Sequence, residues 1–249
     1  MKSHIIIPAR LHSTRLPEKL LLSATGKPLI QHTYEAAQRA QRPTGIIVAT
    51  DHERIVTAVQ AFDGNVVMTD PAAPSGTDRV AEVAKQLSDV DIIVNVQGDE
   101  PEILGSSIDL VIELLQNDPT AVMATLATPI RNQSQLEDPA CVKVVFNQSQ
   151  QAMYFSRSVI PYPQTWDDSL LGKESDLFFQ HVGLYAYRRD FLLKLAKLPQ
   201  SPMETTESLE QLRVLDHGYT ILVGVVDEPS FGIDTKDDYQ AFERKMNSR

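Results

Sequence analysis

Residues 91–96 have the sequence DIIVNV, and this run is the strongest single indication of the fold. Ile92, Ile93 and Val94 follow one another directly, so a strand formed here is apolar on both of its faces. Strands of this kind are typical of a parallel sheet that helices cover on both sides. The run therefore predicts an α/β protein.

Short apolar runs and segments of helical period alternate on either side of this strand. The runs that predict strands lie at 4–7, 46–50, 66–69 and 92–96. Apolar residues recur at intervals of three and four across 29–40, across 55–62 and from Val80 to Leu87, which predicts helices. This order indicates repeated βα units and a Rossmann-like, mostly parallel sheet with helices on both faces.

The pattern changes between about residues 120 and 190, where predicted strands follow one another without long helices. These strands lie at 122–130, 142–147, 151–157 and 180–189, and helical period resumes at 190–198 and 204–215. We expect an antiparallel extension here, with an exposed loop at 161–173. Because no linker or repeat interrupts the chain, we expect a single domain over residues 1–249.

The charge of the chain excludes two classes of partner. Its 249 residues carry a formal net charge of −10, so the overall field repels nucleic-acid polymers and anionic membranes. No apolar run is long enough for a signal-peptide core or a membrane span. We therefore expect a cytoplasmic protein with no nucleic-acid or membrane partner. Cys141 is the only cysteine, which excludes an internal disulfide and a thiolate cluster for zinc.

Basic side chains gather directly after the first strand, in IIIPARLHSTRLPEKLL at residues 5–21. Arg10, Arg15 and Lys19 lie in a loop that leads from a strand toward a helix, which is the usual layout of a phosphate site. The glycine patterns of dinucleotide folds and P-loops are missing. A triphosphate would therefore be held by side chains, by the forks of the arginines and the point charge of the lysine. A solvated basic loop is the alternative.

Two acidic positions are candidates for holding a divalent cation. Asp99 follows the strand at 92–96, where open α/β sheets bind ligands. Mg²⁺ on a triphosphate takes one or two protein carboxylates, although the same position also fits an ordinary turn. Asp234 precedes Thr235 and Asp238, whose spacing resembles a capping box. With Thr235 as the N-cap, Asp234 is not needed to cap the helix.

Two other positions offer groups to an anion. The stretch APSGTDR, at 73–79, places Ser75 and Gly76 at the start of a predicted helix, where free N–H groups can hold an anion or the edge of a base. A turn with a helix cap is the alternative. Arg157 ends a predicted strand, and its guanidinium fork suits a carboxylate. A surface cation at a strand end explains it equally well.

Two segments later in the chain place polar side chains on a common face. In QHVGLYAY, at 180–187, alternation puts His181 and Tyr185 on one side of a strand and apolar residues on the other. Spacings of three and four predict that one helix face carries Glu207, Glu210 and Gln211. The alternatives are a half-exposed sheet face and a solvated acidic face.

The amino-acid sequences of these stretches resemble those of one enzyme family. The chain contains, in that family's order, IIIPARLHSTRLPEKLL, IIVATDHE, SGTDR, IVNVQGDEP, MATLATPI, VKVV, YFSR, HVGLYAYR, LEQLR and GIDT. It resembles the sugar nucleotidyltransferases, and among them the cytidylyltransferases that activate 2-keto sugar acids, above all 3-deoxy-manno-octulosonate (Kdo). The resemblance implies transfer of CMP from CTP to the anomeric hydroxyl of the sugar acid, with Mg²⁺ and release of pyrophosphate, for lipopolysaccharide synthesis. It also implies a homodimer paired through the antiparallel segment.

The resemblance further implies roles for single residues. Those implied for the nucleotide are Ala9, Arg10, Arg15, Lys19, Ser75, Gly76, Arg79 and Gln97. Those implied for the sugar acid are Gln97, Arg157, His181, Tyr185, Glu210 and Gln211. Metal binding falls to Asp99 and Asp234, and catalysis to these two with Arg10 and Lys19. An enzyme for sialic acid or 8-amino Kdo, and a CTP-binding regulator without activity, stay open as alternatives.

The chain departs from the usual family pattern at two positions. Glu18 stands where the family has glycine in L-P-G-K-P-L, directly before Lys19, and we expect its carboxylate to face solvent. Thr205 follows Glu204 where the family commonly has histidine. The second departure bears on which sugar acid is used.

Overall fold

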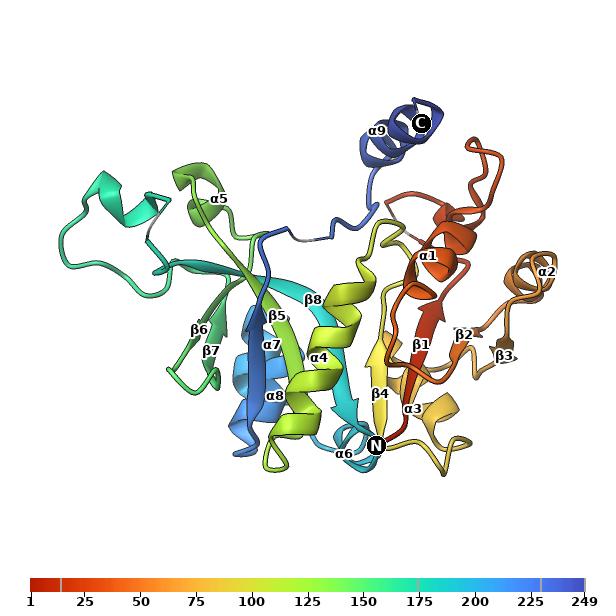
Figure 1. Ribbon diagram of the computed structural model, residues 1–249, viewed down its shortest axis with the longest axis horizontal. Coiled ribbons are helices and arrows are strands. Elements are labelled where there is room, and N and C mark those ends of the chain that lie inside the picture. The colour runs from red at the N-terminus through yellow and green to blue at the C-terminus, as the bar shows by residue number, and fades with distance from the viewer. Residues whose placement is uncertain (14, 174, 229, 249) are drawn as a thin grey trace. The chain divides into compact units, whose positions relative to one another are not determined.

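The apolar runs of the first half form a parallel sheet in a computed structural model, which describes residues 1–13, 15–173, 175–228 and 230–248 (Figure 1). The strands are β1 (Ser3–Ala9), β2 (Ile46–Thr50), β3 (Val66–Met68) and β4 (Ile92–Asn95). Every pairing among them is parallel, in the order β3-β2-β1-β4. These strands belong to a compact unit formed by Met1–Ile112 and Ser230–Arg249, and Glu113–Pro229 form a second unit.

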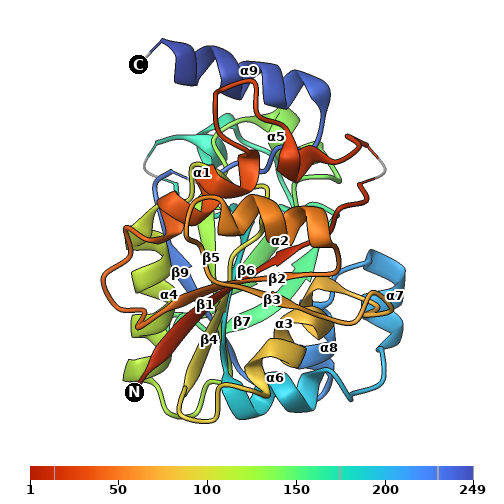
Figure 2. The same cartoon turned by 90° about the vertical axis from the view of Figure 1, so that its right-hand side faces the viewer.

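A helix lies in each of the three segments of the first unit where apolar spacing predicts one, at 29–40, 55–62 and 80–87, and others lie at 105–117 and 236–247. They are α1 (Leu29–Ala37), α2 (Glu53–Gln60), α3 (Gly76–Ala84), α4 (Gly105–Asn117), which runs on into the second unit, and α9 (Lys236–Asn247). Figures 1 and 2 show α2 and α3 on opposite sides of β2 and β3. No helix in the described part of the chain is long and apolar enough to cross a lipid bilayer.

The parallel register brings the polar loops to one edge of the sheet. Ala9 at the end of β1 lies opposite Thr50 at the end of β2, and Ile6 lies opposite Asn95 of β4. The loops that follow these strands therefore leave from the same edge. Gly98 shows how closely they approach, because a Cβ there would lie 3.0 Å from the carbonyl oxygen of Pro8.

The second unit contains the predicted antiparallel region. Its strands are β5 (Met123–Pro129), β6 (Lys143–Phe146), β7 (Ala152–Ser156), β8 (Phe179–Arg188) and β9 (Ile221–Val225). β5 pairs with β8 in antiparallel and with β9 in parallel orientation, and β6 pairs antiparallel with β7 and β8. The helices are α5 (Gln133–Glu137), α6 (Arg189–Leu195), α7 (Pro202–Glu207) and α8 (Gln211–Asp216).

A small apolar cluster lies beside α5. Cys141 is buried there with Ile130, Leu136 and Phe178. Burial raises the pKa of the Cys141 thiol, so the only cysteine is a core residue with little thiolate character.

The single helix predicted over 204–215 is wrong, because α7 ends at Glu207 and α8 begins at Gln211. Ser208 between them has a left-handed backbone with φ of 52°, which ends a helix. A capping box of Ser201 and Glu204 starts α7, and the Glu204 carboxylate also accepts Nε of Arg213 at 2.8 Å. Glu207, Glu210 and Gln211 therefore do not share one helix face.

Candidate active site

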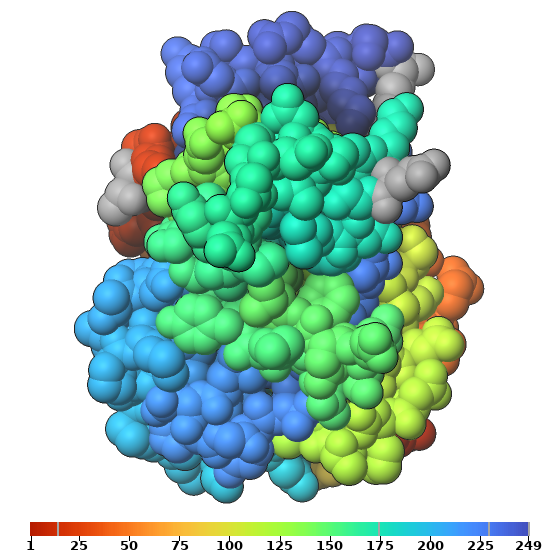
Figure 3. All heavy atoms as spheres, turned by 90° about the vertical axis from the view of Figure 1, so that its left-hand side faces the viewer, coloured from red at the N-terminus to blue at the C-terminus, as the bar shows by residue number. Residues whose placement is uncertain are grey.

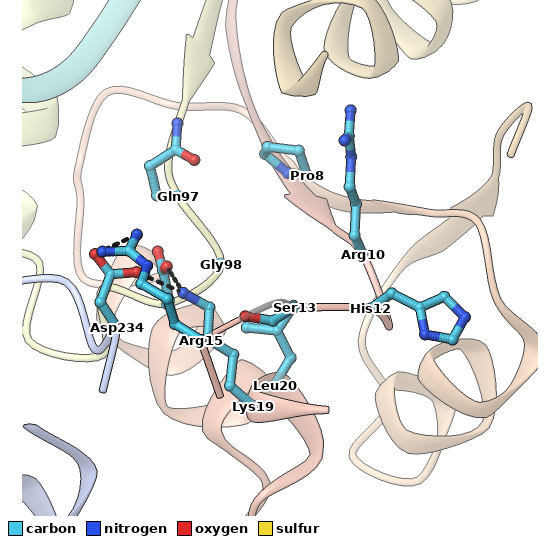
Figure 4. A pocket seen from close by; sticks show the side chains of 11 residues that line it. Pro8, Arg10, His12, Ser13, Arg15, Lys19, Leu20, Gln97, Gly98 and Asp234 are labelled. Atoms are coloured by element: carbon cyan, nitrogen blue, oxygen red, sulfur yellow. Dashed lines mark hydrogen bonds and ion pairs between the residues drawn. The ribbon is translucent and has the colours of Figure 1, made fainter. Parts of the chain in front are cut away.

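A cavity of about 300 Å³ lies where the loops after β1 and β4 meet (Figure 4). Its lining is Pro8, Arg10, His12, Ser13, Arg15, Lys19, Leu20, Gln97, Gly98, Asp99 and Asp234. All of these residues belong to the first unit. The structure thus brings together the three predicted phosphate-binding cations, both predicted metal carboxylates and Gln97. The described lining does not include Ala9, Ser75, Gly76 or Arg79.

Lys19 lies deepest of the three cations, with its side chain 13% exposed. Its ammonium donates to the Asp99 carboxylate, to Oδ1 of Asp234 at 3.0 Å and to the Ile233 carbonyl at 3.0 Å. Burial lowers the pKa of Lys19, but the hydrogen bonds and charges of Asp99 and then Asp234 outweigh it, and the pKa stands above its ordinary value. A permanent positive charge therefore lies at the base of the cavity.

The two arginines occupy the mouth of the cavity. Arg15 forms an ion pair with Oδ2 of Asp234 at 3.0 Å and is 66% exposed. Arg10 is also exposed and donates to the Ala73 carbonyl at 3.2 Å. Figure 4 shows the Arg10 side chain directed away from Lys19 and Arg15. Both guanidinium groups are accessible to an anion that enters the cavity, and an arginine fork suits phosphate oxygens.

Asp99 and Asp234 converge although 135 positions separate them in the sequence. The Ile233 N–H donates to the Asp99 carbonyl at 2.9 Å, which fastens the segment before α9 to the loop after β4. Thr235 and Asp238 form the capping box of α9. This arrangement confirms that Asp234 is not needed to cap the helix, so its carboxylate faces the cavity instead.

The donor set at this point fits a hard divalent cation. Asp99 and Asp234 supply carboxylate oxygens, which Mg²⁺ prefers. The described residues contain no cluster of three or more His, Cys, Asp or Glu side chains suited to a metal. Phosphate and water oxygens would therefore complete a coordination shell here, as is usual for Mg²⁺ on nucleotides.

Glu100 follows Asp99 directly and is not part of the described cavity lining, and no spacing in the sequence marks it. Its carboxylate is buried and accepts the Ser230 hydroxyl at 2.6 Å. Burial raises the pKa of Glu100 to about 7, while the hydrogen bond from Ser230 lowers it and the charge of Asp99 raises it further. The bond to Ser230 is a second connection between the loop after β4 and the segment before α9.

Ser75 and Arg79, at which we expect nucleotide contacts, form hydrogen bonds with neighbouring residues of the chain. Ser75 is the N-cap of α3, where its hydroxyl accepts the Asp78 N–H at 3.0 Å and donates to the Asp78 carboxylate at 2.6 Å. Arg79 is completely buried, pairs with Asp51 at 2.9 Å and donates to Thr69. Burial lowers the pKa of Arg79, and the charge of Asp51 opposes this. Arg79 thus links the segments that follow β2 and β3.

Arg157 belongs to the second unit and is fixed by its neighbours. Its Nε donates to the Glu207 carbonyl at 2.6 Å, and its NH1 group donates to the Pro139 carbonyl at 3.0 Å. The Glu207 carboxylate accepts the Arg157 N–H at 2.8 Å and the Ser156 hydroxyl at 2.7 Å. Lys143 is fully buried, and its ammonium donates to the Arg157 carbonyl at 2.8 Å. Glu207 therefore organises this strand end and is not a member of a solvated acidic face.

His181 is buried instead of lying on a half-exposed sheet face. A register shift in the β5–β8 pairing, between Thr125 and Leu126, interrupts the alternation on which that expectation depends. Its Nε2 lies 2.9 Å from Oγ1 of Thr125, and its ring centroid lies 5.4 Å from that of Tyr185. Burial lowers the pKa of His181 to about 3, so the ring is neutral at physiological pH.

Glu210 and Gln211 lie at the start of α8. Gln211 is 4% exposed, and its Nε2 has no hydrogen-bond partner among the described residues. A buried amide donor without a partner is unfavourable, and such groups are typical of a ligand site. Glu210 approaches Arg213, with 3.7 Å between Oε1 and the NH2 nitrogen.

Glu18 directs its carboxylate toward the surface, as expected, where it forms an ion pair instead of remaining free. Its carboxylate is partly exposed and accepts both terminal nitrogens of Arg54, with 2.8 Å between Oε2 and the NH2 nitrogen. Its backbone φ is 52°. The glycine that the resemblance places here is the sequence signal for that conformation, whereas nothing in the spacing indicates Arg54 as the partner.

Comparisons with known proteins agree with one another. The cytidylyltransferase family model matches residues 4–221. The 3-deoxy-manno-octulosonate cytidylyltransferase of Rhodopirellula baltica is 46% identical over 250 residues, which are 100% of both chains. The 8-amino-3,8-dideoxy-manno-octulosonate cytidylyltransferase of Shewanella woodyi is 45% identical over 99% of both chains. A solved structure of CMP:2-keto-3-deoxy-manno-octonic acid synthetase complexed with CTP has a TM-score of 0.92 at 42% identity, covering 100% of this chain and 99% of the other. This likeness confirms the predicted fold class.

Proposed function

The chain belongs to the cytidylyltransferase family, and from this premise we propose that it transfers CMP from CTP to the anomeric hydroxyl of Kdo, giving CMP-Kdo and pyrophosphate for lipopolysaccharide synthesis. One observation carries the proposal, the cavity in which three cations and two carboxylates meet. The cations suit a triphosphate, and the carboxylates suit the divalent cation that accompanies it.

The proposed chemistry is an in-line displacement at the α-phosphorus of CTP. The anomeric oxygen forms the new bond to phosphorus, the bond to the β-phosphate oxygen breaks, and the hydroxyl proton passes to solvent. Arg10, Arg15 and Lys19 neutralise the triphosphate and the departing pyrophosphate. Mg²⁺, which Asp99 and Asp234 would hold, supplies further charge neutralisation when bound. The residues act mainly by position and charge.

Recognition of the sugar acid is assigned to Gln97 and to residues of the second unit. Arg157 suits the carboxylate of the substrate, because a guanidinium binds that group in a bidentate manner. Nε2 of Gln211 has no hydrogen-bond partner in the part of the chain that the structure describes, which supports a ligand-binding role. His181 is neutral and has a pKa of about 3, which makes it a poor general base at neutral pH. We assign His181 to hydrogen bonding with the sugar, together with Tyr185 and Glu210.

Ser75, Gly76 and Arg79 are assigned to the nucleotide end of the site together with Ala9. Ser75 and Gly76 lie at the start of α3, and the N-terminus of a helix is a favourable place for an anion or the edge of a base. Arg79 is completely buried, so its part is to support these segments from below.

A pyrophosphate-release assay with CTP, Mg²⁺ and a panel of sugar acids tests the proposal. The panel contains Kdo, 8-amino Kdo and sialic acid, and we expect the highest kcat/KM with Kdo. Preference for 8-amino Kdo would establish the second candidate, which the Shewanella woodyi relative favours. CTP binding without pyrophosphate release from any of the three would show a regulator and refute the proposed activity. Unchanged turnover in excess chelator would remove the metal from the proposal.

We further propose that the protein is a homodimer that acts in the cytoplasm, where CTP is available. An apolar hollow of about 490 Å³ in the second unit supports the dimer. Its lining includes Val144, Phe146, Leu177, Phe179 and Val225. Figure 3 shows the face of the molecule that carries β6 and β7. Leu177 and Val225 are exposed apolar residues, which a second copy of the chain would cover.

A further inference from the structure

Glu18 adopts a backbone conformation that is unfavourable for a residue with a side chain. Its φ is 52° and its ψ 29°, which is the left-handed region that glycine occupies readily and other residues rarely. A short 3₁₀ turn, η1 (Lys19–Leu21), follows directly. The Glu18 carbonyl accepts the Leu21 N–H at 2.9 Å, so the backbone at Glu18 sets the direction of this turn.

Arg54 holds the Glu18 side chain in a two-pronged contact. One terminal nitrogen of the guanidinium lies 2.8 Å from Oε2, and the other donates to Oε1. A pair of parallel bonds fixes orientation as well as distance. The hydrogen bond from Arg54 is the main cause that lowers the pKa of Glu18. An unfavourable backbone conformation is thereby stabilised through its side chain.

Arg54 in turn has a rigid support. It lies in the first turn of α2, where its N–H donates to Nδ1 of His52 at 3.1 Å. The same helix is anchored by Ile55 and Val59, which are fully buried. The ion pair therefore fastens the loop after β1 to the helix that follows β2.

We propose that the Glu18–Arg54 ion pair positions Lys19, and that Arg54 is a positioning residue for the reaction. Lys19 adjoins Glu18, and its ammonium reaches Asp99 and Asp234 on the floor of the cavity. Rotation of the Glu18 backbone toward a commoner conformation turns the Cα–Cβ bond of Lys19 and draws the ammonium off the carboxylates. The inference rests on the proposed function in one respect, that Lys19 binds the triphosphate.

The test compares Arg54→Ala, Glu18→Gly and the double variant with the wild type. The matched control is Lys2→Ala, which removes another exposed ion pair, with Asp89, at the start of β1. We expect Arg54→Ala to lower kcat/KM for CTP by about three- to five-fold, the size of effect of one lost positioning contact. The KM for the sugar acid and the thermal midpoint should match those of the control.

Glu18→Gly should rescue the loss in Arg54→Ala. Glycine adopts a φ of 52° without a partner, so Glu18→Gly and the double variant should both stay near the wild type. Raising the NaCl concentration gives an independent readout, because salt screens an exposed ion pair. The ratio of kcat/KM for CTP between wild type and Glu18→Gly should fall as salt rises.

Equal kcat/KM in Arg54→Ala and Lys2→Ala would overturn the proposal. A double variant as impaired as Arg54→Ala would also overturn it, because Arg54 would then act without Glu18. Calorimetric measurement of CTP affinity separates this inference from the proposed function. If no pyrophosphate is released but CTP affinity follows the same order across the variants, only the proposed function fails. A wild type that binds no CTP refutes both.

Discussion

Lys19 is the residue on which the phosphate-binding proposal depends most. Its ammonium is held between two carboxylates at the base of the cavity, where a charge acts more strongly than at the surface. We expect Lys19→Ala to lower the rate of pyrophosphate release ten-fold or more, a loss of at least about 1.4 kcal/mol of transition-state stabilisation. Steady-state assays with CTP and the sugar acid varied separately measure this.

Lys27→Ala is the matched control for this prediction. Lys27 is an exposed lysine of the same segment, paired with Glu35 at 2.8 Å, and its loss should leave turnover unchanged. An effect of Lys19→Ala confined to the KM of the sugar acid would contradict the role given to Lys19.

Substitution of Asp234 tests whether this residue has a structural or a catalytic role. Thr235 and Asp238 cap α9 without it, so Asp234→Asn should shift the thermal midpoint by only a few degrees, as a surface change of about 0.5 kcal/mol does. The same substitution removes the negative charge that holds a divalent cation. We expect turnover to collapse at low Mg²⁺ and to recover partly at high Mg²⁺ or with Mn²⁺.

Turnover measured against metal concentration for Asp234→Asn and Asp99→Asn tests this expectation. Both variants should need more metal than the wild type. Near-normal turnover of Asp234→Asn at low Mg²⁺ would leave Asp99 as the only protein ligand.

His181 should make the stability of the protein depend on pH. Burial lowers its pKa from 6.5 to about 3, so between these values the unfolded chain binds a proton that the folded chain does not. The free energy of unfolding therefore falls as the pH drops below about 6.5, by roughly one kcal/mol per pH unit. Urea unfolding of the wild type and His181→Gln at several pH values measures it, and the advantage of the wild type should shrink on acidification. An advantage that stays constant with pH would show that the ring is protonated in the folded state.

The elements of the first unit follow closely from the sequence. Runs such as Ile5 to Ile7 and Ile92 to Val94 are apolar on both faces, and they form the buried, paired strands β1 and β4. The position of the site can be predicted for the same reason, because the loops that follow parallel strands lie at one edge of the sheet. Periodicity could predict this much because burial on both faces leaves few other structures for such runs.

The helix break at Ser208 could not be predicted from spacing. Local apolar period continues across 204–215, but the pairing of Glu204 with Arg213 bends the chain back on itself. That contact joins residues of two separate helices, and a pattern read along one helix does not contain it. The same holds for Arg54, whose partner Glu18 lies 36 positions away.

Among the elements, we expect the largest loss in the free energy of unfolding when the capping box of α7 is removed. Glu204 is buried, caps its own helix and pairs with buried Arg213. Glu204→Ala leaves Arg213 without its main partner, and we expect a loss of about 3 kcal/mol in the free energy of unfolding. Thermal unfolding should show a midpoint lower by roughly 10 °C. Thr206→Ala, an exposed change in the same helix, is the control, and an equal midpoint in both variants would contradict the role of this pair.

The basic side chains at the cavity are opposite in sign to the net charge of the whole molecule. The formal net charge is −10, yet Arg10, Arg15 and Lys19 border one cavity. The net charge lowers non-specific binding of polyanions, while the local cations suit the one small anion that we propose binds there.

Assembly is the prediction that belongs to the molecule as a whole. Leu177 lines the apolar hollow of the second unit and is 37% exposed. We expect Leu177→Arg to weaken or abolish the dimer without a change in fold, because an arginine in an apolar interface loses its hydration. Sedimentation measured over a range of protein concentrations checks this. An exposed change elsewhere, Lys85→Ala, should leave the dimer intact, and a wild type that sediments as a monomer would refute the proposed assembly.

The position of the single cysteine allows motions of the second unit to be measured by a chemical reaction. Cys141 is the only thiol in the chain and is buried beside α5. A disulfide-exchange reagent can react with it only after that part of the structure opens. The labelling rate in native buffer therefore reports the opening equilibrium of the second unit, without an engineered probe. Its change on adding CTP would show whether events in the cavity of the first unit are transmitted to the second.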